Sequence, residues 1–266
     1  MPEPSADSFT RRHLRLVDKP VHRLGLACNF GLDADGAATA FERGVNYVYW
    51  TNHRVARVRP VLKQALAKDR ARFVVATGPT LAFFGRSVRA GAEKALRELG
   101  TDYLDVLQLF WLGKTSALTA ATADEMRKLK EEGKVRAFGI SIHDRPRAGR
   151  LAADSPVDLF MLRYNAAHPG AERDVFPHLA RRRPHVVAYT ATSWRKLLKR
   201  PRGWDGPVMS AGDCYRFCLS SPHVDVVLSG PASRAQLEEN LAALDKGPLS
   251  ADEDAWMRRF GARVHG

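Results

Sequence analysis

Short apolar runs alternate with helical segments along most of this chain, and this alternation constrains the fold more than any other feature. The runs are rich in β-branched and aromatic residues and are often apolar at consecutive positions, which is typical of strands buried on both faces of a parallel sheet. Eight such runs predict right-handed βαβ units that close into a single α/β barrel, a (β/α)8 TIM barrel. An open doubly wound sheet is the alternative, but no Gly-x-Gly-x-x-Gly follows the first run. The expected strands are His22–Ala27, Asn46–Trp50, Phe73–Thr77, Tyr103–Trp111, Val135–Ser141, Val157–Arg163, His185–Thr190 and Val224–Ser229.

Helix signals lie between the expected strands. The segment Asp33–Arg43 begins with an acidic N-cap candidate and is followed by Gly44, which suits the position after a helix C-terminus. A second helix is expected to end before Gly100, because Ala92, Ala95, Leu96 and Leu99 form an apolar stripe at helical spacing. Two further helices are expected at Asp124–Glu132 and Ala235–Leu244.

The length of 266 residues suits one barrel domain, since such barrels typically take about 250 residues. Residues 1–10 are polar and expected to be mobile, and residues 11–21 hold a possible N-terminal hairpin that caps the barrel. No run approaches the roughly 20 apolar residues that span a bilayer, so no membrane association is expected. The N-terminus has no apolar signal-peptide core, and the three cysteines cannot all pair, so a cytoplasmic location is expected.

The formal net charge is +13, and much of it is concentrated in one segment. No acidic residue occurs from Val175 to Trp204. A solvated basic surface is the favoured interpretation; attraction of a phosphate or cofactor and approach to nucleic acid are the alternatives, with nucleic acid the least favoured. The basic residues of this segment are Arg181, Arg182, Arg183, Arg195, Lys196, Lys199, Arg200 and Arg202.

Several phrases, taken in order along the chain, resemble aldo-keto reductases of the shorter bacterial kind. The most distinctive is residues 132–141, Glu-Gly-Lys-Val-Arg-Ala-Phe-Gly-Ile-Ser. The resemblance covers residues 22 to 245 and implies the same barrel fold. The other phrases are residues 43–48, 99–106, 163–165 and 230–233, the last followed by Gln236, Glu239 and Asn240.

The resemblance implies hydride transfer from NADPH to a carbonyl. In that family a Tyr donates the proton, a Lys lowers the pKa of the Tyr, an Asp holds the Lys, and a His orients the carbonyl. The cation is needed because Tyr titrates near pH 10, far from neutrality. The sequence departs from this tetrad at every position, so ordinary carbonyl reduction is not expected. The corresponding positions hold Tyr49, Arg54 with His53 beside it, Gly78 and Phe110.

The cofactor end of the resemblance implies NADP(H) binding. Tyr189 matches the aromatic residue that the family stacks on the nicotinamide, and Thr190 can offer a hydroxyl to the pyrophosphate. Ser233 and Arg234 lie where a 2′-phosphate is held, and the helix that starts there presents free N–H groups to an anion. Ile142 and Met161 replace an expected Asn and Gln near the nicotinamide. The remaining candidate cofactor ligands are Ser141, Asn165, Gln236, Glu239 and Asn240.

Tyr49 and His53 are the candidate catalytic pair, because a His titrates near neutrality and both residues are expected at the C-terminal mouth of the barrel. His143 is a weaker candidate at the same mouth. Alternatively, the aromatic residues there fill a pocket that is no longer used. No metal site is expected: Cys214 and Cys218 lack a neighbouring His or second Cys pair and are expected to be buried structural cysteines.

Three hypotheses for the function follow. The first is a divergent oxidoreductase that binds NADP(H) and uses a rebuilt proton donor, or none if the hydride acceptor is already activated. The second is a catalytically inactive NADP(H)-binding sensor or partner protein. The third is a non-redox barrel that uses the aromatic mouth for another small-molecule ligand. The sequence leaves the substrate and the oligomeric state open.

Overall fold

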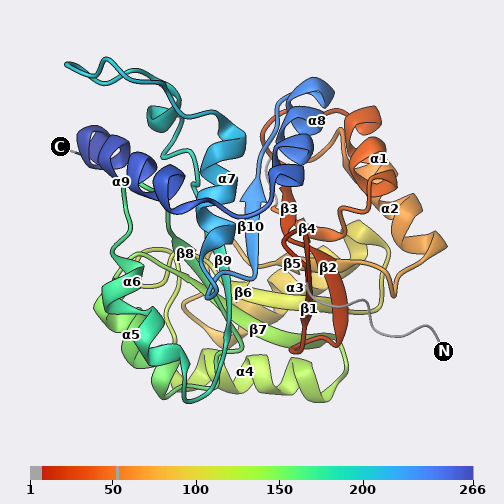
Figure 1. Ribbon diagram of the computed structural model, residues 1–266. Coiled ribbons are helices and arrows are strands. Elements are labelled where there is room, and N and C mark those ends of the chain that lie inside the picture. The colour runs from red at the N-terminus through yellow and green to blue at the C-terminus, as the bar shows by residue number, and fades with distance from the viewer. Residues whose placement is uncertain (1–7, 52–53, 266) are drawn as a thin grey trace.

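A computed structural model describes residues 8–51 and 54–265 and contains the predicted barrel (Figure 1). Within these residues, eight parallel strands close in the order β10-β3-β4-β5-β6-β7-β8-β9. Each expected strand is present, but Phe110 and Trp111 lie beyond the end of their strand because Trp111 turns into the left-handed region with φ +47°. The strands are β3 Leu24–Ala27, β4 Tyr47–Tyr49, β5 Val74–Thr77, β6 Leu104–Leu109, β7 Val135–Ile142, β8 Leu159–Arg163, β9 His185–Tyr189 and β10 Val226–Ser229.

Helices pack around the barrel (Figure 1). The four helices expected from the sequence are confirmed, although α4 begins at Ala120 because Thr119 caps its N-terminus. Between β8 and β9 the chain forms only two short helices, α6 and the 3₁₀ helix η1, so this part of the outer layer is thin. None of the described helices is both long and apolar enough to cross a membrane. The helices are α1 Ala34–Glu42, α2 Arg59–Lys68, α3 Gly85–Leu99, α4 Ala120–Glu131, α5 Arg145–Ala153, α6 Ala171–Asp174, η1 Phe176–Leu179, η2 Lys196–Leu198, α7 Ala211–Ser220, α8 Arg234–Ala243, η3 Leu244–Lys246 and α9 Ala251–His265.

An antiparallel hairpin precedes the barrel. It pairs β1 Arg11–Leu14 with β2 Lys19–His22, and its apolar residues Leu14, Val17 and Val21 pack against side chains of the barrel interior. The expectation that the first barrel strand begins at His22 is wrong, because His22 pairs with Arg11 in the hairpin. The expectation of mobility for residues 1–10 falls largely outside the described residues, which begin at residue 8.

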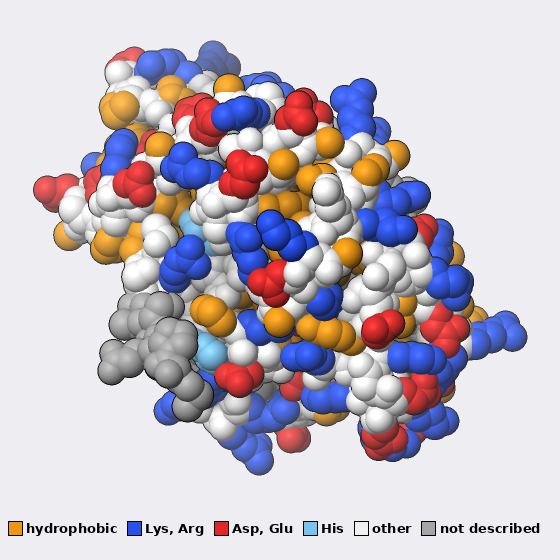
Figure 2. Space-filling model, turned by 90° about the vertical axis from the view of Figure 1, so that its right-hand side faces the viewer, with side chains coloured by type: hydrophobic (Ala, Val, Ile, Leu, Met, Phe, Trp, Pro, Cys, Tyr) orange, Lys and Arg blue, Asp and Glu red, His pale blue; other side chains and the backbone are white. Residues whose placement is uncertain are grey.

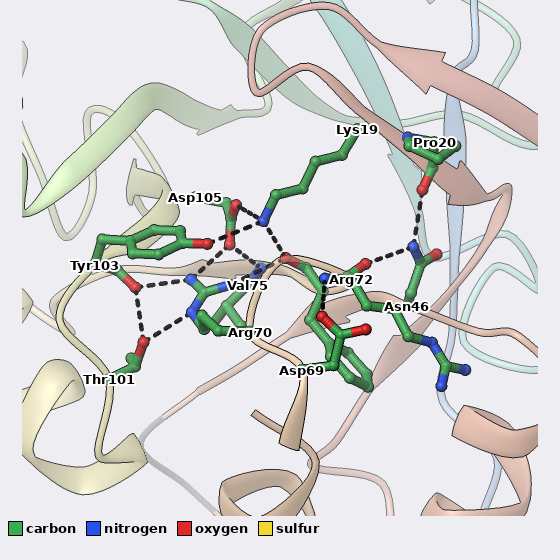
Figure 3. A network of polar contacts seen from close by, with 11 residues as sticks. Lys19, Pro20, Asn46, Asp69, Arg70, Arg72, Val75, Thr101, Tyr103 and Asp105 are labelled. Atoms are coloured by element: carbon green, nitrogen blue, oxygen red, sulfur yellow. Dashed lines mark hydrogen bonds and ion pairs between the residues drawn. The ribbon is translucent and has the colours of Figure 1, made fainter. Parts of the chain in front are cut away.

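A buried charge network joins this hairpin to the N-terminal ends of β5 and β6 (Figure 3). The Nζ of Lys19 lies 2.7 Å from one carboxylate oxygen of Asp105, and the Nη2 of Arg70 lies 2.7 Å from the other. The backbone N–H of Val75 donates to the same carboxylate at 2.9 Å. Asp105 is fully buried, so both of its cation partners are needed to offset the loss of its hydration.

His22 makes the junction between the hairpin and β3 sensitive to acid. Burial lowers the pKa of His22 from its ordinary value to about 4, and its Nδ1 accepts a hydrogen bond from the N–H of Leu24. The unfolded chain takes up this proton below about pH 6.5, whereas the folded chain resists it. We therefore expect stability from His22 to be complete above about pH 6.5 and to be lost as the pH falls toward 4, by about 3 kcal/mol in all.

Urea unfolding of the wild type and His22→Asn across this pH window is the measurement. The variant should lose part of the slope of unfolding free energy against pH, while His223→Asn, at an exposed position, should keep the wild-type slope. Identical slopes for wild type and His22→Asn would contradict the expectation.

Candidate active site

An aromatic pair lies at the C-terminal mouth of the barrel, where barrel active sites form. The rings of Tyr49, from the end of β4, and Phe110, just past β6, meet edge to face with centroids 5.6 Å apart. Burial raises the pKa of Tyr49 well above its usual value, and the neighbouring Tyr189 adds to the shift. Tyr49 therefore keeps its proton at neutral pH. His53, the other half of the predicted catalytic pair, lies outside the described residues.

Gly78 closes the adjacent part of the mouth, at the end of β5. A Cβ at this position would lie 2.0 Å from the backbone carbonyl oxygen of Gln108 and 3.3 Å from the ring of Phe110. Side chains do not approach a backbone oxygen this closely, so strand β6 would have to move to admit any residue larger than glycine. The strand end thus leaves no space for a lysine beside Tyr49.

Tyr189 and His143 form a polar pair at the same mouth of the barrel. The hydroxyl of Tyr189, at the end of β9, lies 2.8 Å from Nε2 of His143, which follows β7. Partial burial, and then the charge of Arg163, lower the pKa of His143. Burial raises the pKa of Tyr189 to about 12. At neutral pH the neutral imidazole therefore accepts the hydrogen bond that the tyrosine hydroxyl donates. The ring of Trp111 lies beside the same imidazole, with its centroid 5.7 Å from that of His143.

The other candidate ligands at the nicotinamide end already form hydrogen bonds within the protein. Asn165 is fully buried; its amide donates to the Thr190 carbonyl at 2.8 Å and its oxygen accepts from the Ala167 N–H at 3.0 Å. The Thr190 hydroxyl donates to the Tyr189 carbonyl at 2.7 Å. Ser141 is buried beside Tyr189 and helps to limit the rise in that pKa. Asn165 thus holds the ends of β8 and β9 together.

The candidate adenosine and phosphate ligands lie on the first turns of α8. Ser233 caps this helix by accepting from the Gln236 N–H, and both side chains are exposed, as is that of Glu239. Arg234 is also exposed and pairs with Glu238 at 2.9 Å. Asn240 is different, because it is buried and donates to the Ser229 hydroxyl at 3.2 Å. Four of the five residues are therefore open to a ligand.

The barrel interior below the mouth contains an unsatisfied amide that the sequence analysis did not single out. Gln108 is fully buried, and neither its Nε2 nor its Oε1 has a hydrogen-bond partner among the described residues. Its Cγ lies 3.2 Å from where a Cβ on Gly139 would be, so the glycine makes room for it. An amide residue among the apolar side chains of the C-terminal half of β6 was the signal available in the sequence. Buried amides without partners are costly, which makes this position a candidate for water or ligand contact.

Large apolar side chains that remain exposed gather around the mouth. Within the described part of the chain, every exposed large hydrophobic residue lies on a loop that follows the C-terminal end of a barrel strand. Exposed apolar groups gathered around a pocket are typical of a binding site rather than a solvated surface. These residues are Phe30, Leu81, Phe83, Phe84, Trp111 and Trp194.

Cys214 and Cys218 lie on α7 and are buried and unpaired, as expected. Burial raises the pKa of both thiols, and the Cys218 thiol donates to the Tyr164 carbonyl at 3.2 Å. They therefore act as packing residues of the outer layer.

Comparison with known proteins gives consistent matches along the chain. The model of the Aldo/keto reductase family matches residues 40–200, more than half of the chain. Methylglyoxal reductase YeaE of Escherichia coli is 30% identical over a segment that covers 40% of this chain and 38% of that protein. The match thus spans less than half the length of that reductase. L-galactose dehydrogenase of Arabidopsis thaliana is 22% identical, covering 79% of this chain and 78% of that protein.

Solved structures agree with the barrel over almost the whole chain. Aldo-keto reductase AKR11C1 from Bacillus halodurans, in its holo form, superposes with a TM-score of 0.80 at 22% identity, covering 94% of this chain and 96% of that one. An aldo-keto reductase from Klebsiella pneumoniae in complex with NADPH gives a TM-score of 0.74 at 21% identity, covering 95% of both chains. At these identities the structures establish the fold.

Proposed function

The chain belongs to the aldo/keto reductase family, and we propose that it is an NADP(H)-binding oxidoreductase whose proton-transfer site has been rebuilt. The observation that carries the proposal is the packing around Gly78. A Cβ there would overlap the Gln108 carbonyl at 2.0 Å, so the position that the family gives to lysine cannot hold a cation without moving β6. Without a cation, burial keeps Tyr49 protonated. Ordinary aldehyde and ketone reduction is therefore not the proposed reaction.

NADP(H) is the cofactor that the exposed groups of this mouth fit. Arg234 and Ser233 stand at the N-terminus of α8, where N–H groups and a guanidinium suit a phosphate. The half-buried ring of Tyr189, at the end of β9 next to β10, offers a face for the nicotinamide. The NADPH bound to the Klebsiella pneumoniae reductase supports the assignment. When bound, this cofactor supplies a hydride.

We assign proton transfer to and from the substrate to His143 and Tyr189 rather than to Tyr49. The hydroxyl of Tyr189 and the Nε2 of His143 share one proton at 2.8 Å, and His143 is exposed to incoming ligand. Partial burial, and then the charge of Arg163, lower the pKa of His143, so the neutral imidazole can accept a proton from an alcohol or pass one from solvent. Tyr49 and Phe110 then form the apolar wall opposite, and a role for His53 beside Tyr49 stays a prediction.

The ligand that fits this mouth is a small, largely apolar molecule. Exposed aromatic side chains such as Phe83 and Trp111 surround the opening, and the Tyr49–Phe110 pair lines its wall. An acceptor whose electrophilic centre is already activated needs no strong acid from the protein. We therefore propose an apolar, activated hydride acceptor as the substrate class.

Titration with NADPH and NADH, followed by tryptophan fluorescence, tests the proposal, and a screen of activated acceptors for NADPH oxidation follows. We expect saturable binding with preference for NADPH, and turnover that falls by about 100-fold in His143→Phe. The matched control, His223→Phe, replaces an exposed His far from the mouth and should keep full turnover. Absence of binding at millimolar cofactor would refute the proposal and favour a non-redox ligand at the mouth.

Arg234 gives a sharper prediction about the cofactor. Arg234→Ala should weaken NADPH binding by about 10-fold while leaving NADH nearly unchanged, because only NADPH carries the 2′-phosphate that a guanidinium can hold. Glu238→Gln is the complementary variant, since it removes the carboxylate that now pairs with Arg234 at 2.9 Å. It should bind NADPH at least as tightly as the wild type. Equal losses for both cofactors in Arg234→Ala would contradict the 2′-phosphate assignment.

Binding without turnover is the second candidate function. The filled space around Gly78 and Phe110 favours it, because a mouth packed with aromatic rings can hold a cofactor without moving a proton. Saturable NADPH binding with no oxidation of NADPH by any acceptor tested would select this candidate, and the protein would then act as a sensor or partner subunit.

A further inference from the structure

The N-terminal end of the barrel, opposite the proposed active site, carries a second cavity. A depression of about 230 Å³ lies between the hairpin turn and the start of β9. It shares Arg15, Arg183 and His185 with a groove of about 1210 Å³ that continues along the outer layer beside η1 and α7. The groove lies where the chain forms only α6 and η1 between β8 and β9.

The cations around the smaller cavity are not neutralised by carboxylates. Arg15, Arg182 and Arg183 form no ion pair with any residue in ranges 8–51 and 54–265, and the Nη2 of Arg15 donates instead to the Arg183 carbonyl at 3.3 Å. The carboxylates at the rim are already occupied. Asp158 pairs with Lys130 and accepts from the Phe138 N–H, and Asp225 accepts from Arg12, His185 and the Val186 N–H.

His185 adds an independent observation at the base of the cavity. Its side chain is 7% exposed, and its Nδ1 lies 3.1 Å from the carboxylate of Asp225. Its Nε2 is buried and has no hydrogen-bond partner within the described part of the chain, although the residue lines both cavities. A buried polar atom without a partner marks a place where a ligand group can complete the hydrogen bonding.

We propose that this end of the barrel binds a small molecule bearing phosphate groups. Three guanidinium groups suit phosphate oxygens, and the Nε2 of His185 can accept a hydrogen bond from a protonated phosphate oxygen. At about 30 Å³ each, roughly seven water-sized groups fit in the cavity, which matches a diphosphate or triphosphate better than a nucleic-acid backbone. Pro177, Ala180 and Pro222, which are exposed in the adjoining groove, provide a small apolar surface for the rest of the ligand.

One face of the molecule lacks the continuous basic stripe that a nucleic-acid interface needs. On the face shown in Figure 2, Lys and Arg side chains are interspersed with acidic and apolar ones instead of forming one continuous stripe. A nucleic-acid interface is typically a basic stripe or patch. The site therefore explains part of the basic segment as a local cluster, built by Arg182 and Arg183 together with Arg15 of the hairpin.

Calorimetric titration with sodium pyrophosphate, at constant ionic strength, tests the proposal. We expect saturable binding that weakens by at least about 10-fold in Arg182→Gln/Arg183→Gln. The matched control is Arg259→Gln/Arg263→Gln, which removes the same charge from exposed positions on α9 and should change binding by less than about 2-fold. Circular dichroism and thermal melting establish that both double variants are folded.

Three outcomes would overturn the proposal. The first is no saturable heat with pyrophosphate in the wild type, whether or not a short RNA binds. The second is equal weakening of pyrophosphate binding in both double variants. The third is displacement of pyrophosphate by NADPH together with loss of pyrophosphate binding in Arg234→Ala, which would place the anion at the barrel mouth. ATP in place of pyrophosphate should bind more tightly if the apolar groove takes part.

Discussion

Asp105→Asn should lower the free energy of unfolding by about 3–5 kcal/mol. The substitution keeps the shape of the side chain and removes its charge, which leaves the buried Lys19 and the partly buried Arg70 without a counter-ion. The amide oxygen can still accept a hydrogen bond from the Val75 N–H. The loss of stability therefore measures the charge interactions of Asp105 alone. Urea unfolding at neutral pH is the measurement.

Asp124 provides the matched control for this prediction. It also pairs with two cations, Arg127 and Lys128, but its side chain is 45% exposed on the surface of α4. Asp124→Asn should therefore leave the free energy of unfolding nearly unchanged, since solvent screens exposed ion pairs. The triple variant Lys19→Met/Arg70→Met/Asp105→Leu should recover much of the loss, because it leaves no isolated charge behind. A cost for Asp105→Asn as small as that for Asp124→Asn would show that burial of the charges is not what stabilises this end of the barrel.

Gly78→Ala should destabilise the protein by about 3 kcal/mol, at the upper end of the usual cost of overpacking. The added Cβ would meet the Gln108 carbonyl oxygen at 2.0 Å, and a backbone atom in a closed barrel cannot rotate away as a flexible side chain can. The melting temperature and the tryptophan fluorescence should both change, because β6 leads directly into Phe110 and Trp111.

Gly206→Ala is the control for the glycine prediction. Its Cβ would approach only the side chain of Trp204, at 3.1 Å, in an exposed loop, so its stability should change by less than about 1 kcal/mol. Gly78→Lys should be at least as unstable as Gly78→Ala and should not restore carbonyl reduction. A stable Gly78→Lys variant that reduces simple aldehydes would refute the proposal that the proton-transfer site has been rebuilt.

The sequence was sufficient for the barrel because its strand signal is local. Runs such as Phe73–Ala76 are apolar at consecutive positions, and this pattern indicates burial on both faces without knowledge of the neighbouring strands. Boundaries were less accurate where long-range pairing decides them. His22 belongs to the hairpin because Arg11 pairs with it, and no local signal distinguishes a final hairpin residue from the first residue of a barrel strand.

For the candidate site, the sequence indicated which residues stand at the mouth but not which of them interact. It placed Tyr49, His143 and Tyr189 at or just beyond the C-terminal ends of strands, and the structure brings Tyr189 and His143 to within 2.8 Å of each other while Tyr49 packs against Phe110. Which side chains meet depends on strand order around the closed barrel, since β7 and β9 are separated by β8 and by more than forty residues of chain. The pleat of a strand sets the direction of each side chain. Whether side chains of different strands meet depends on how the strands close into the barrel.

The chain's own pattern of apolar runs and helix caps therefore determined the barrel, and the residues at its strand ends led to the prediction that the family's tetrad is absent. Only the tertiary structure decided that Gly78 has no space for a side chain, that Asn240 is turned inward, and that Arg15 meets Arg183 at the opposite end. Sequence patterns indicate which positions of each segment are buried. These features depend instead on distances between segments, which are fixed only when the barrel closes.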